Sequence, residues 1–281
     1  MGCLDEQVVI VTGAGRGIGR ATALLCGREG ARVLADDLGC DAAGRGADSS
    51  VSDRVANEIV ALGGVAVASH EDVSGREGPR RLTERAMDEF GRLDAVIACA
   101  GVARNRQLLR MSDDDLDAVM NVQLRSSIRL TRAGAQTMAR QGNGGSIVLS
   151  AGASALFGSP HQSSLTAAFA GLMGFARSAA MELRRQGIRV NTVAPLARTR
   201  LTENNPVFKG IGADSLSATH VAPVNAYLAS RLSVEVSGEF VAVAGSRVYL
   251  LAVRETTGIF ADGAGFALEE LQRGWNEITR G

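Results

Sequence analysis

The sequence predicts a doubly wound α/β fold, with a seven-stranded, mainly parallel sheet and helices on both faces. The first observation is a regular alternation of short apolar runs with longer amphipathic segments along the 281 residues. The second is that most short runs are nearly continuous in Val, Ile, Leu and Ala, as expected for parallel strands covered on both faces. The third is a glycine-rich turn between the first run and the first helical segment. The length suits one domain with a substantial core.

The elements follow one another in a strict order. The seven expected strands are the apolar runs at 7–11, 32–35, 65–68, 95–99, 146–149, 188–194 and 240–244. The helical segments are expected at about 17–29, 50–62, 76–90, 112–141, 163–186 and 218–232. Because each crossover joins two parallel strands, we expect the crossovers to be right-handed.

One stretch departs from this alternation. Residues 39–50 are rich in Gly, Ala, Asp and Ser, and we expect them to form an enlarged loop after the second strand. No stretch resembles an interdomain linker, so a single domain is expected over residues 1–281. Within it we expect a substrate lid at about 197–217 and a C-terminal extension at about 250–281.

The overall composition excludes several classes of function. Thirty Lys and Arg residues balance thirty Asp and Glu residues, so a broad electrostatic footprint for nucleic acid or an acidic membrane is not expected. No 18-residue apolar stretch predicts a transmembrane helix, and the N-terminus does not resemble a signal peptide. Four cysteines without CxxC spacing favour neither a metal site nor a disulfide framework. We therefore expect a cytoplasmic protein.

Lysine and tyrosine are unusually scarce. Lys209 is the only lysine, and Tyr227 and Tyr249 are the only tyrosines. Catalysis by an ammonium or a phenol group therefore has three candidate residues in the whole chain.

The glycine-rich turn is a candidate nucleotide site. Its glycines would let a pyrophosphate approach the backbone at the N-terminus of the first helix, where free N–H groups and a partial positive charge favour anions. The expected pyrophosphate residues are Gly13, Gly15, Arg16, Gly17, Ile18 and Gly19.

Acidic residues follow the second and third strands. Asp36 and Asp37 lie about 20 residues after the turn, where a carboxylate accepts hydrogen bonds from ribose hydroxyls and repels a 2′-phosphate. NAD is therefore favoured over NADP. Asp72 would meet the adenine amino group; the alternative is a turn or helix-capping residue.

Several motifs together resemble a short-chain dehydrogenase/reductase over about residues 5–250. They are the glycine pattern, Asp72-Val73, Ala100-Gly101 and the run from Pro195 to Thr199. The resemblance implies a Rossmann fold, and it adds Val73, Ala100, Gly101, Pro195 and Thr199 to the expected NAD-binding residues. The Asp37-Leu38-Gly39 turn, with its glycine-rich insertion, is similar to the branch acting on 3-hydroxyacyl-CoA and related substrates.

The catalytic residues of that family are replaced. Family members use a Tyr as general acid/base and a Lys four residues later, which lowers the pKa of the phenol, together with a Ser and an Asn. Gly158, Gln162 and Ala170-Gly171 anchor the register of this segment. In that register the Asn, Ser, Tyr and Lys positions are Gln123, Gly152, Leu165 and Phe169.

A shifted register does not restore the missing groups. The residue four positions before Lys209 is Asn205, so no YxxxK motif exists in the chain. Ser150 and Ser154 flank the Ser position two residues away on either side, a displacement of about 6–7 Å along a strand. Ordinary alcohol–ketone hydride transfer is therefore expected to be absent or vestigial.

Apolar side chains take the place of the proton carrier and its cation. Leu165 and Phe169 share one helical face, where they would fill the cleft with apolar surface. His161 is a candidate acid/base in the neighbouring loop; the alternative is an exposed loop histidine. Arg198 and Arg200 would be lid-surface charges or contacts to a CoA phosphate.

Three functions compete. The chain is a redox-inactive or structural subunit of an oligomeric oxidoreductase, an oxidoreductase with an atypical mechanism on a hydroxyacyl or ketone substrate, or a non-redox lyase or isomerase. The resemblance implies a homo- or hetero-oligomer with a related subunit, formed through the helices at about 112–141 and 163–186. An acyl-CoA-like small molecule is a further expected partner; nucleic acid, membrane and metal are not expected.

Overall fold

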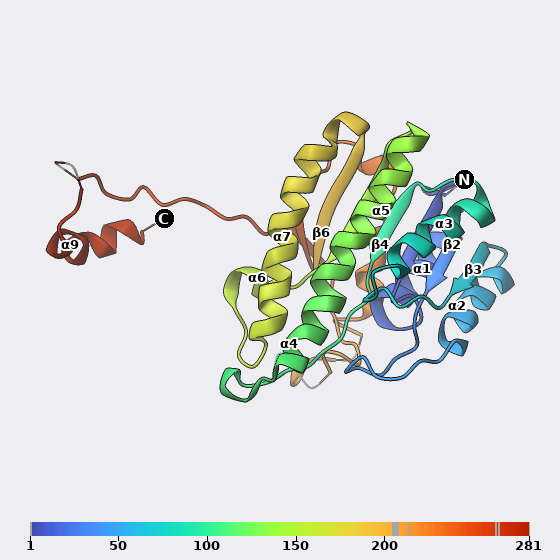
Figure 1. The fold of residues 1–281 in the computed structure, drawn as a ribbon, viewed down its shortest axis with the longest axis horizontal. Helices are drawn as coiled ribbons and strands as arrows, with labels where there is room; N and C mark the ends of the chain where they lie inside the picture. Colours follow the sequence, from blue (N-terminus) through green and yellow to red (C-terminus); the bar gives the residue numbers. More distant parts are fainter. Residues whose placement is uncertain (1, 204–207, 213, 262, 264, 281) are drawn as a thin grey trace. The chain divides into compact units, whose positions relative to one another are not determined.

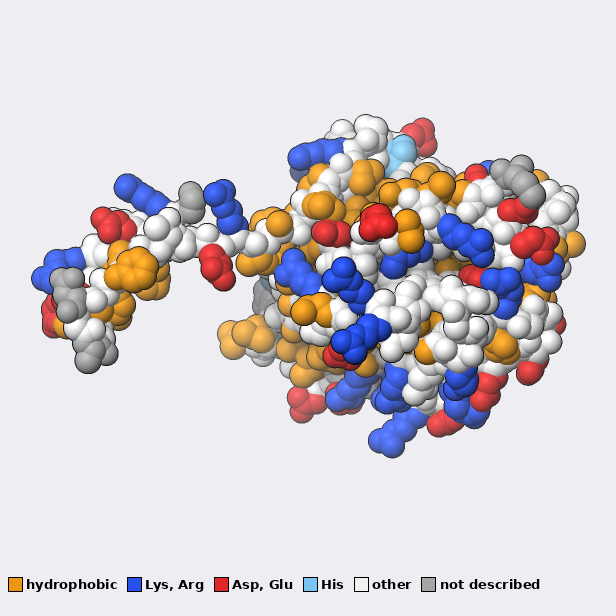
Figure 2. Space-filling model, turned by 90° about the horizontal axis from the view of Figure 1, so that it is seen from above, with side chains coloured by type: hydrophobic (Ala, Val, Ile, Leu, Met, Phe, Trp, Pro, Cys, Tyr) orange, Lys and Arg blue, Asp and Glu red, His pale blue; other side chains and the backbone are white. Residues whose placement is uncertain are grey.

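The computed structural model describes residues 2–203, 208–212, 214–261, 263 and 265–280. They divide into two compact units, Met1–Leu250 and Leu251–Gly281. The first unit holds the sheet and every predicted site residue. The second holds helix α9 (Leu268–Ile278) and coincides with the stretch where we expected a C-terminal extension of a single domain. Figure 2 shows that positive and negative side chains are interspersed over the visible face of the first unit.

The first unit is built on one eight-stranded sheet of order β3-β2-β1-β4-β5-β6-β7-β8 (Figure 1). Strands β1 to β7 are mutually parallel. Their bounds are β1 Val8–Thr12, β2 Arg32–Asp36, β3 Val65–Ser69, β4 Ala95–Ala98, β5 Gly145–Ser150, β6 Ile188–Leu196 and β7 Phe240–Ala244. The predicted doubly wound fold and its seven parallel strands are confirmed.

The prediction of seven strands in total was wrong by one. Strand β8 (Arg247–Leu250) turns back from β7 and pairs with it antiparallel, with Ala244 opposite Arg247. Gly245 has a positive φ of 56°, which a tight hairpin turn requires. Most residues of β8 are exposed at the sheet edge, so β8 lacks the buried apolar run by which the other strands were found.

Helices cover both faces of the sheet. Helices α1, α2 and α8 pack together on one face, whereas α3, α5 and α7 pack on the other, where α5 and α7 lie side by side (Figure 1). The bounds are α1 Gly17–Arg28, α2 Ser50–Ala61, α3 Gly78–Phe90, α4 Asp113–Val119, α5 Ser126–Gln141, α6 Ser154–Phe157, α7 Ser163–Leu183 and α8 Ala222–Ala229.

Alternation along β1 explains why its whole sequence is apolar. Val9 and Val11 belong to the core cluster beneath α1 and α2, whereas Val8 and Ile10 belong to the cluster beneath α3 and α5. All four side chains are fully buried. Successive side chains of a strand point to opposite faces, so a strand between two helix layers must be apolar throughout.

The predicted helix 112–141 is interrupted. A π-helical turn over Met120–Arg125 separates α4 from α5, and Gln123 lies within it. Such turns are frequent at functional sites. Among the described residues, no helix is long and apolar enough to cross a membrane.

The sheet order fixes where a ligand can bind. The chain leaves β1 toward β2 on one side, and β4 lies on the other side of β1, so the direction of winding reverses between β1 and β4. In open α/β sheets, ligands bind at the carboxyl ends of the strands at this reversal point.

Candidate active site

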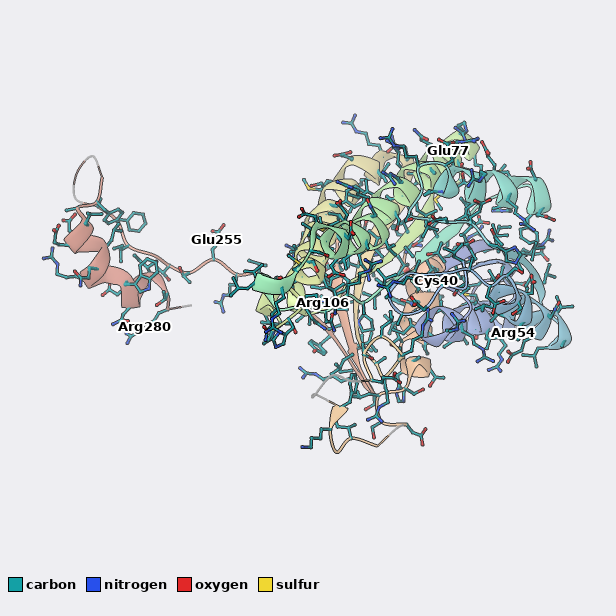
Figure 3. All side chains as sticks on the ribbon, turned by 60° about the horizontal axis from the view of Figure 1, so that its bottom comes forward. Cys40, Arg54, Glu77, Arg106, Glu255 and Arg280 are labelled. Atoms are coloured by element: carbon teal, nitrogen blue, oxygen red, sulfur yellow. The ribbon has the colours of Figure 1, made fainter. Side chains whose placement is uncertain are left out.

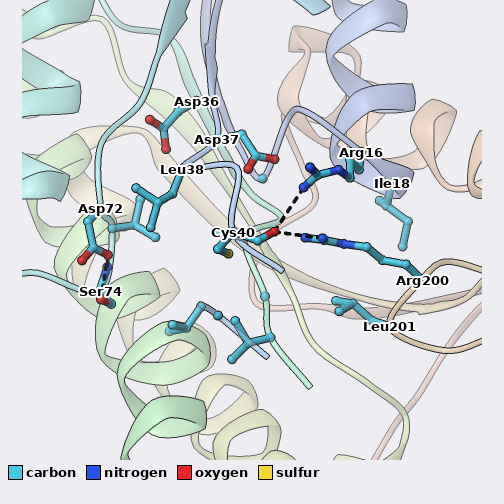
Figure 4. A pocket seen from close by; sticks show the side chains of 18 of the residues that line it. Arg16, Ile18, Asp36, Asp37, Leu38, Cys40, Asp72, Ser74, Arg200 and Leu201 are labelled. Carbon is cyan, nitrogen blue, oxygen red and sulfur yellow. Dashed lines mark hydrogen bonds between the residues drawn. The ribbon is translucent and has the colours of Figure 1, made fainter. Parts of the chain in front are cut away.

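A cavity of about 370 Å³ lies at the carboxyl ends of β1 to β4 (Figure 4). Segments that follow each of these four strands line it, together with a segment that follows β6. The lining residues are Gly13, Arg16, Gly17, Ile18, Asp36, Asp37, Leu38, Cys40, Gly44, Glu71, Asp72, Val73, Ser74, Ala100, Gly101, Val102, Val122, Thr199, Arg200 and Leu201.

The glycine loop between β1 and α1 forms one wall of the cavity. Gly13 has a positive φ of 65°, and a Cβ at this position would lie 2.8 Å from the Ala100 backbone. A Cβ on Gly19 would collide with the Gly13 carbonyl oxygen, so this glycine lets α1 pack closely against the turn. Helix α1 begins at Gly17 and presents its N-terminal N–H groups at the cavity. The loop therefore has the geometry of an anion site.

Asp37 is held in place by two backbone donors. Its Oδ2 accepts a hydrogen bond from the Gly15 N–H at 2.9 Å, and its Oδ1 accepts one from the Gly39 N–H at 2.7 Å. An ionised carboxylate has about four acceptor positions, so acceptor capacity remains for two hydroxyl groups. Asp37 lines the cavity and is 8% exposed. It is a fixed negative acceptor in a position to bind a ribose diol.

Asp36 has a different environment from its neighbour. It is only 1% exposed, and one carboxylate oxygen accepts a hydrogen bond from the Glu71 N–H at 2.9 Å. Burial raises the pKa of Asp36 to about 7, and the negative charges of Asp37 and Glu71 add to the effect. The sequence treats the two aspartates as an equivalent pair; the structure makes Asp37 the better-placed ribose acceptor.

Asp72 forms a local turn at the far end of the cavity. Its Oδ1 accepts hydrogen bonds from the Ser74 N–H at 2.9 Å and the Ser74 hydroxyl at 2.6 Å. This is the turn role that the sequence left open for Asp72. The second carboxylate oxygen makes no protein hydrogen bond among the described residues, so an adenine contact stays a prediction.

Most predicted cofactor residues line this one cavity. Three of them do not, namely Gly15, Gly19 and Pro195. The Gly15 N–H donates a hydrogen bond to Asp37, and Gly19 lets α1 pack closely against the turn. Pro195 lies in β6 opposite Val243. Other residues also line the cavity but were not predicted from the sequence: Leu38, Cys40, Gly44, Glu71, Ser74, Val102, Val122 and Leu201. The glycine-rich insertion after the second strand is the sequence feature that could have predicted Cys40 and Gly44 as lining residues.

Phe169 and Gly152 contact each other. A Cβ built on Gly152 would lie 2.8 Å and 2.9 Å from two ring carbons of Phe169. The benzyl group therefore occupies the space into which a side chain at 152 would project. The positions that the register assigns to Ser and Lys are thus packed against one another as apolar surface.

Leu165 and Gln123 are also engaged by the protein itself. Leu165 packs against the apolar cluster of Val102, Val119 and Ala168. The Gln123 side-chain amide donates a hydrogen bond to the Val102 carbonyl at 3.2 Å, and Gln123 is 7% exposed. Neither residue lines the cavity.

The chain's tyrosines and its lysine lie away from the cavity. Tyr227 is on α8, Tyr249 is on β8 beneath the guanidinium of Arg247, and Lys209 is exposed beyond β6. No tyrosine or lysine is among the residues that line the cavity in the described part of the chain.

The remaining acid/base candidate is exposed. His161 has a positive φ of 63°, and its backbone carbonyl accepts a hydrogen bond from the Arg106 N–H. Its side chain does not line the cavity. This is the exposed loop histidine that the sequence left open as the alternative.

The start of the predicted lid is anchored by side-chain hydrogen bonds. The Arg198 guanidinium donates to the carbonyls of Phe208 and Ile211 and lies over the Phe208 ring. Arg198 thus holds the segment together, while Thr199 and Arg200 line the cavity. Residues 204–207 and 213 of the predicted lid lie outside the described residues.

The family model for short chain dehydrogenases matches residues 7–206, which include every part of the cavity described above. The chain belongs to the short-chain dehydrogenase/reductase family. This is a family of oxidoreductases, as the motifs predict.

Curated relatives and solved structures agree with this assignment. The chain is 40% identical over 241 residues to the peroxisomal multifunctional enzyme type 2 of Mus musculus, covering 86% of this chain and 32% of that protein. The chain thus spans about a third of that relative's length. The match agrees with the predicted placement near the 3-hydroxyacyl-CoA dehydrogenase-like branch, which is confirmed.

Two solved structures share the fold. A short chain dehydrogenase from Mycobacterium avium superposes with a TM-score of 0.87 at 30% identity, covering 99% of this chain and 98% of that one. The carveol dehydrogenase of Mycobacterium avium, solved in complex with NAD, superposes with a TM-score of 0.78 at 25% identity, covering 86% of this chain and 97% of that one.

Proposed function

We propose that this family member binds NAD and has lost the family's ordinary alcohol–ketone hydride transfer, acting as a redox-inactive or structural subunit of an oligomeric oxidoreductase. The observation that carries the proposal is the contact of Phe169 with Gly152. A ring in that place leaves no room for a serine hydroxyl and supplies no ammonium group.

The surrounding side chains support the loss of proton transfer. Leu165 at the Tyr position has no ionisable group, and no YxxxK pair exists elsewhere in the chain. Removing general acid/base help typically slows a reaction by about 10²–10⁴-fold. The Gln123 amide is engaged with a backbone carbonyl, so it is committed to fixing the loop after β4.

The residues that remain fit a dinucleotide. Gly13 and Gly17 leave the backbone bare at the N-terminus of α1, where a pyrophosphate would bind. Asp37 would accept the hydroxyls of the adenosine ribose and, by its charge, disfavour the 2′-phosphate of NADP. When bound, the nicotinamide ring supplies a hydride donor or acceptor. NAD binding to the relative from Mycobacterium avium supports the same cofactor here.

Neither alternative function gains support from His161. An atypical hydride-transfer mechanism or a non-redox elimination would need a proton carrier inside the cavity, and the His161 side chain is exposed outside it. The redox-inactive subunit therefore stands as the better supported function.

We also propose that the chain is an oligomer subunit that associates through the helices at about 112–141 and 163–186. Support comes from α7, where Ala167 and Gly174 are exposed and Met181 is 79% exposed. Small exposed residues allow close helix packing, and an exposed methionine favours burial in an interface. An acyl-CoA-like molecule remains part of the proposal as a second ligand. So does a cytoplasmic location, which the four free cysteines support.

The experiment that tests the proposal separates binding from turnover. NADH is titrated into the purified protein by calorimetry, and the same protein is then assayed with a 3-oxoacyl-CoA. Binding without turnover is expected. Turnover at the rate of an intact family member contradicts the proposal. Purification from the native cell tests the oligomer: a co-purifying family member with a YxxxK motif is expected for a hetero-oligomer.

A further inference from the structure

The loop between β2 and α2 forms an ordered strap, defined here as residues 38–48. Its base is closed by a hydrogen bond from the Asp48 N–H to the Leu38 carbonyl at 3.0 Å. At its tip, the Asp41 carboxylate accepts hydrogen bonds from the N–H groups of Ala43 and Arg45 at 2.9 Å and 2.8 Å. Loops with close ends and internal hydrogen bonds behave as compact bodies. The strap is therefore expected to move as one piece.

The strap crosses the carboxyl end of β1. It starts at β2, and its tip is bonded to the loop after β4: the Ala103 N–H donates to the Ala42 carbonyl at 2.8 Å, and the Arg104 Nε donates to the Ala43 carbonyl at 2.9 Å. Because β1 lies between β2 and β4, the strap spans the strand end from which the glycine loop emerges. Leu38, Cys40 and Gly44 of the strap line the cavity.

Two arginines from different segments hold the middle of the strap at Cys40, which Figure 3 labels within the fold and Figure 4 shows from close by. Arg16 of the glycine loop and Arg200 of the segment after β6 each donate from a guanidinium nitrogen to the Cys40 carbonyl, at 3.2 Å and 2.9 Å. In Figure 4 both side chains approach Cys40 from the same side of the cavity. Neither guanidinium has a carboxylate within 4.0 Å among the described residues. Two cations thus converge on one neutral oxygen.

We propose that the strap, latched by Arg200 to the segment after β6, closes over the bound dinucleotide and sets the rate at which it enters and leaves. The proposal rests on the proposed NAD binding. Because Arg200 and the strap lie on separate segments, the strap separates from the segment after β6 only when the hydrogen bond between them opens. The Arg200–Cys40 hydrogen bond joins protein to protein, so its loss raises the opening rate of the strap. Because Arg200 also lines the cavity, the equilibrium affinity is measured beside the rates to detect a lost ligand contact.

The test is a stopped-flow measurement of NADH association and dissociation with the full chain. Arg200→Met removes the guanidinium and keeps the aliphatic stem. Losing a hydrogen bond to a charged group is expected to raise the association and dissociation rates of NADH by about tenfold each. Because both rates rise together, the dissociation constant is expected to stay within about threefold of that of the unaltered protein. Arg45→Met is the matched control, because Arg45 is exposed on the same strap and its side chain makes no hydrogen bond among the described residues.

Each outcome decides a separate claim. If unaltered protein binds no NADH at equilibrium, the proposed function fails and the strap proposal fails with it. If NADH binds but Arg200→Met leaves both rates unchanged, the strap proposal alone fails. If only dissociation accelerates, so that affinity falls by the same factor, Arg200 contacts the ligand directly and the latch is refuted.

A second measurement needs no ligand. Hydrogen exchange of the Ala103 N–H, which donates to the strap, is expected to accelerate in Arg200→Met and to stay unchanged in Arg45→Met. Equal exchange in all three proteins overturns the proposal. A rise throughout the sheet, in place of a rise confined to the strap and its partners, shows that the variant disturbs the whole fold and also counts against a local latch.

Discussion

Replacing Gly152 by Ser restores the hydroxyl that the family pattern has at this position, but it places a Cβ against Phe169. The two nearest ring carbons would lie 2.8 Å and 2.9 Å from that Cβ, closer than real Cβ atoms are found to approach other atoms. Phe169 is a residue of α7, and its side chain packs against the core cluster that lies between this helix and the sheet. Either the ring or the β5–α6 connection must therefore move.

Inserting atoms into a well-packed region typically costs about 1–3 kcal/mol. We expect Gly152→Ser to lower the free energy of unfolding by that amount, and each kcal/mol lowers Tm by about 2–4 °C in a domain of this size. Gly212→Ser is the matched control, because a Cβ at the exposed Gly212 meets only the Ser215 Oγ, at an ordinary contact distance of 3.5 Å. The control is expected to change the free energy of unfolding by less than about 0.5 kcal/mol.

Urea denaturation of Gly152→Ser, Phe169→Ala and the double variant measures the coupling between the two positions. The serine is expected to cost nothing further once the ring is gone, which gives a coupling energy of about 1–3 kcal/mol. If Gly152→Ser lowers the free energy of unfolding equally in the presence of Phe169 and in Phe169→Ala, the claim that Phe169 fills this space is refuted.

Three further predictions concern two residues of the cavity and the exposed His161. Asp37→Asn is expected to weaken NADH binding by about 10- to 100-fold in calorimetry, because a charged acceptor is lost. Asp88→Asn is the control, since Asp88 is an exposed carboxylate on α3. Equal affinity in all three proteins would exclude Asp37 as the ribose acceptor. Burial raises the pKa of Asp36 from 3.8 to about 7. Between these two pH values the folded protein keeps a proton on Asp36 that the unfolded chain has released. The free energy of unfolding therefore falls by up to about 4 kcal/mol as the pH rises from about 4 to about 7. Asp36→Asn is therefore expected to stabilise the protein at pH 8 and to have little effect at pH 4; urea denaturation at both pH values checks this, and an equal effect at both is inconsistent with a raised pKa. His161→Ala is expected to leave NADH affinity unchanged and any product formation unaltered, whereas loss of a measurable activity would reinstate His161 as an acid/base.

The strands were predictable because burial on two faces demands continuous apolar runs. Strand β8 was not, since its residues are mostly exposed at a sheet edge and carry no such signal. The same limit applies to the cavity. The glycine loop and Asp37 follow from local spacing, but Val122 and Arg200 reach the cavity from the distant π-helical turn and the segment after β6. Only the folded sheet brings these segments together.

Environment could not be inferred from residue type alone. Asp36 and Asp37 are chemically identical neighbours, yet the first is a buried carboxyl group with a raised pKa and the second is fixed by two backbone donors. Likewise, the sequence placed apolar residues at the catalytic positions, but it did not show that Phe169 packs onto Gly152. That contact depends on how α7 packs on the strand before it.

The most direct test of the central claim measures NADH binding and NADH oxidation on one preparation. The protein is titrated with NADH, then given an excess of a 3-oxoacyl-CoA while NADH absorbance is followed. We predict saturable binding with consumption at least about 10²-fold slower than that of an intact family member under the same conditions. Consumption at the rate of the intact enzyme would contradict the account.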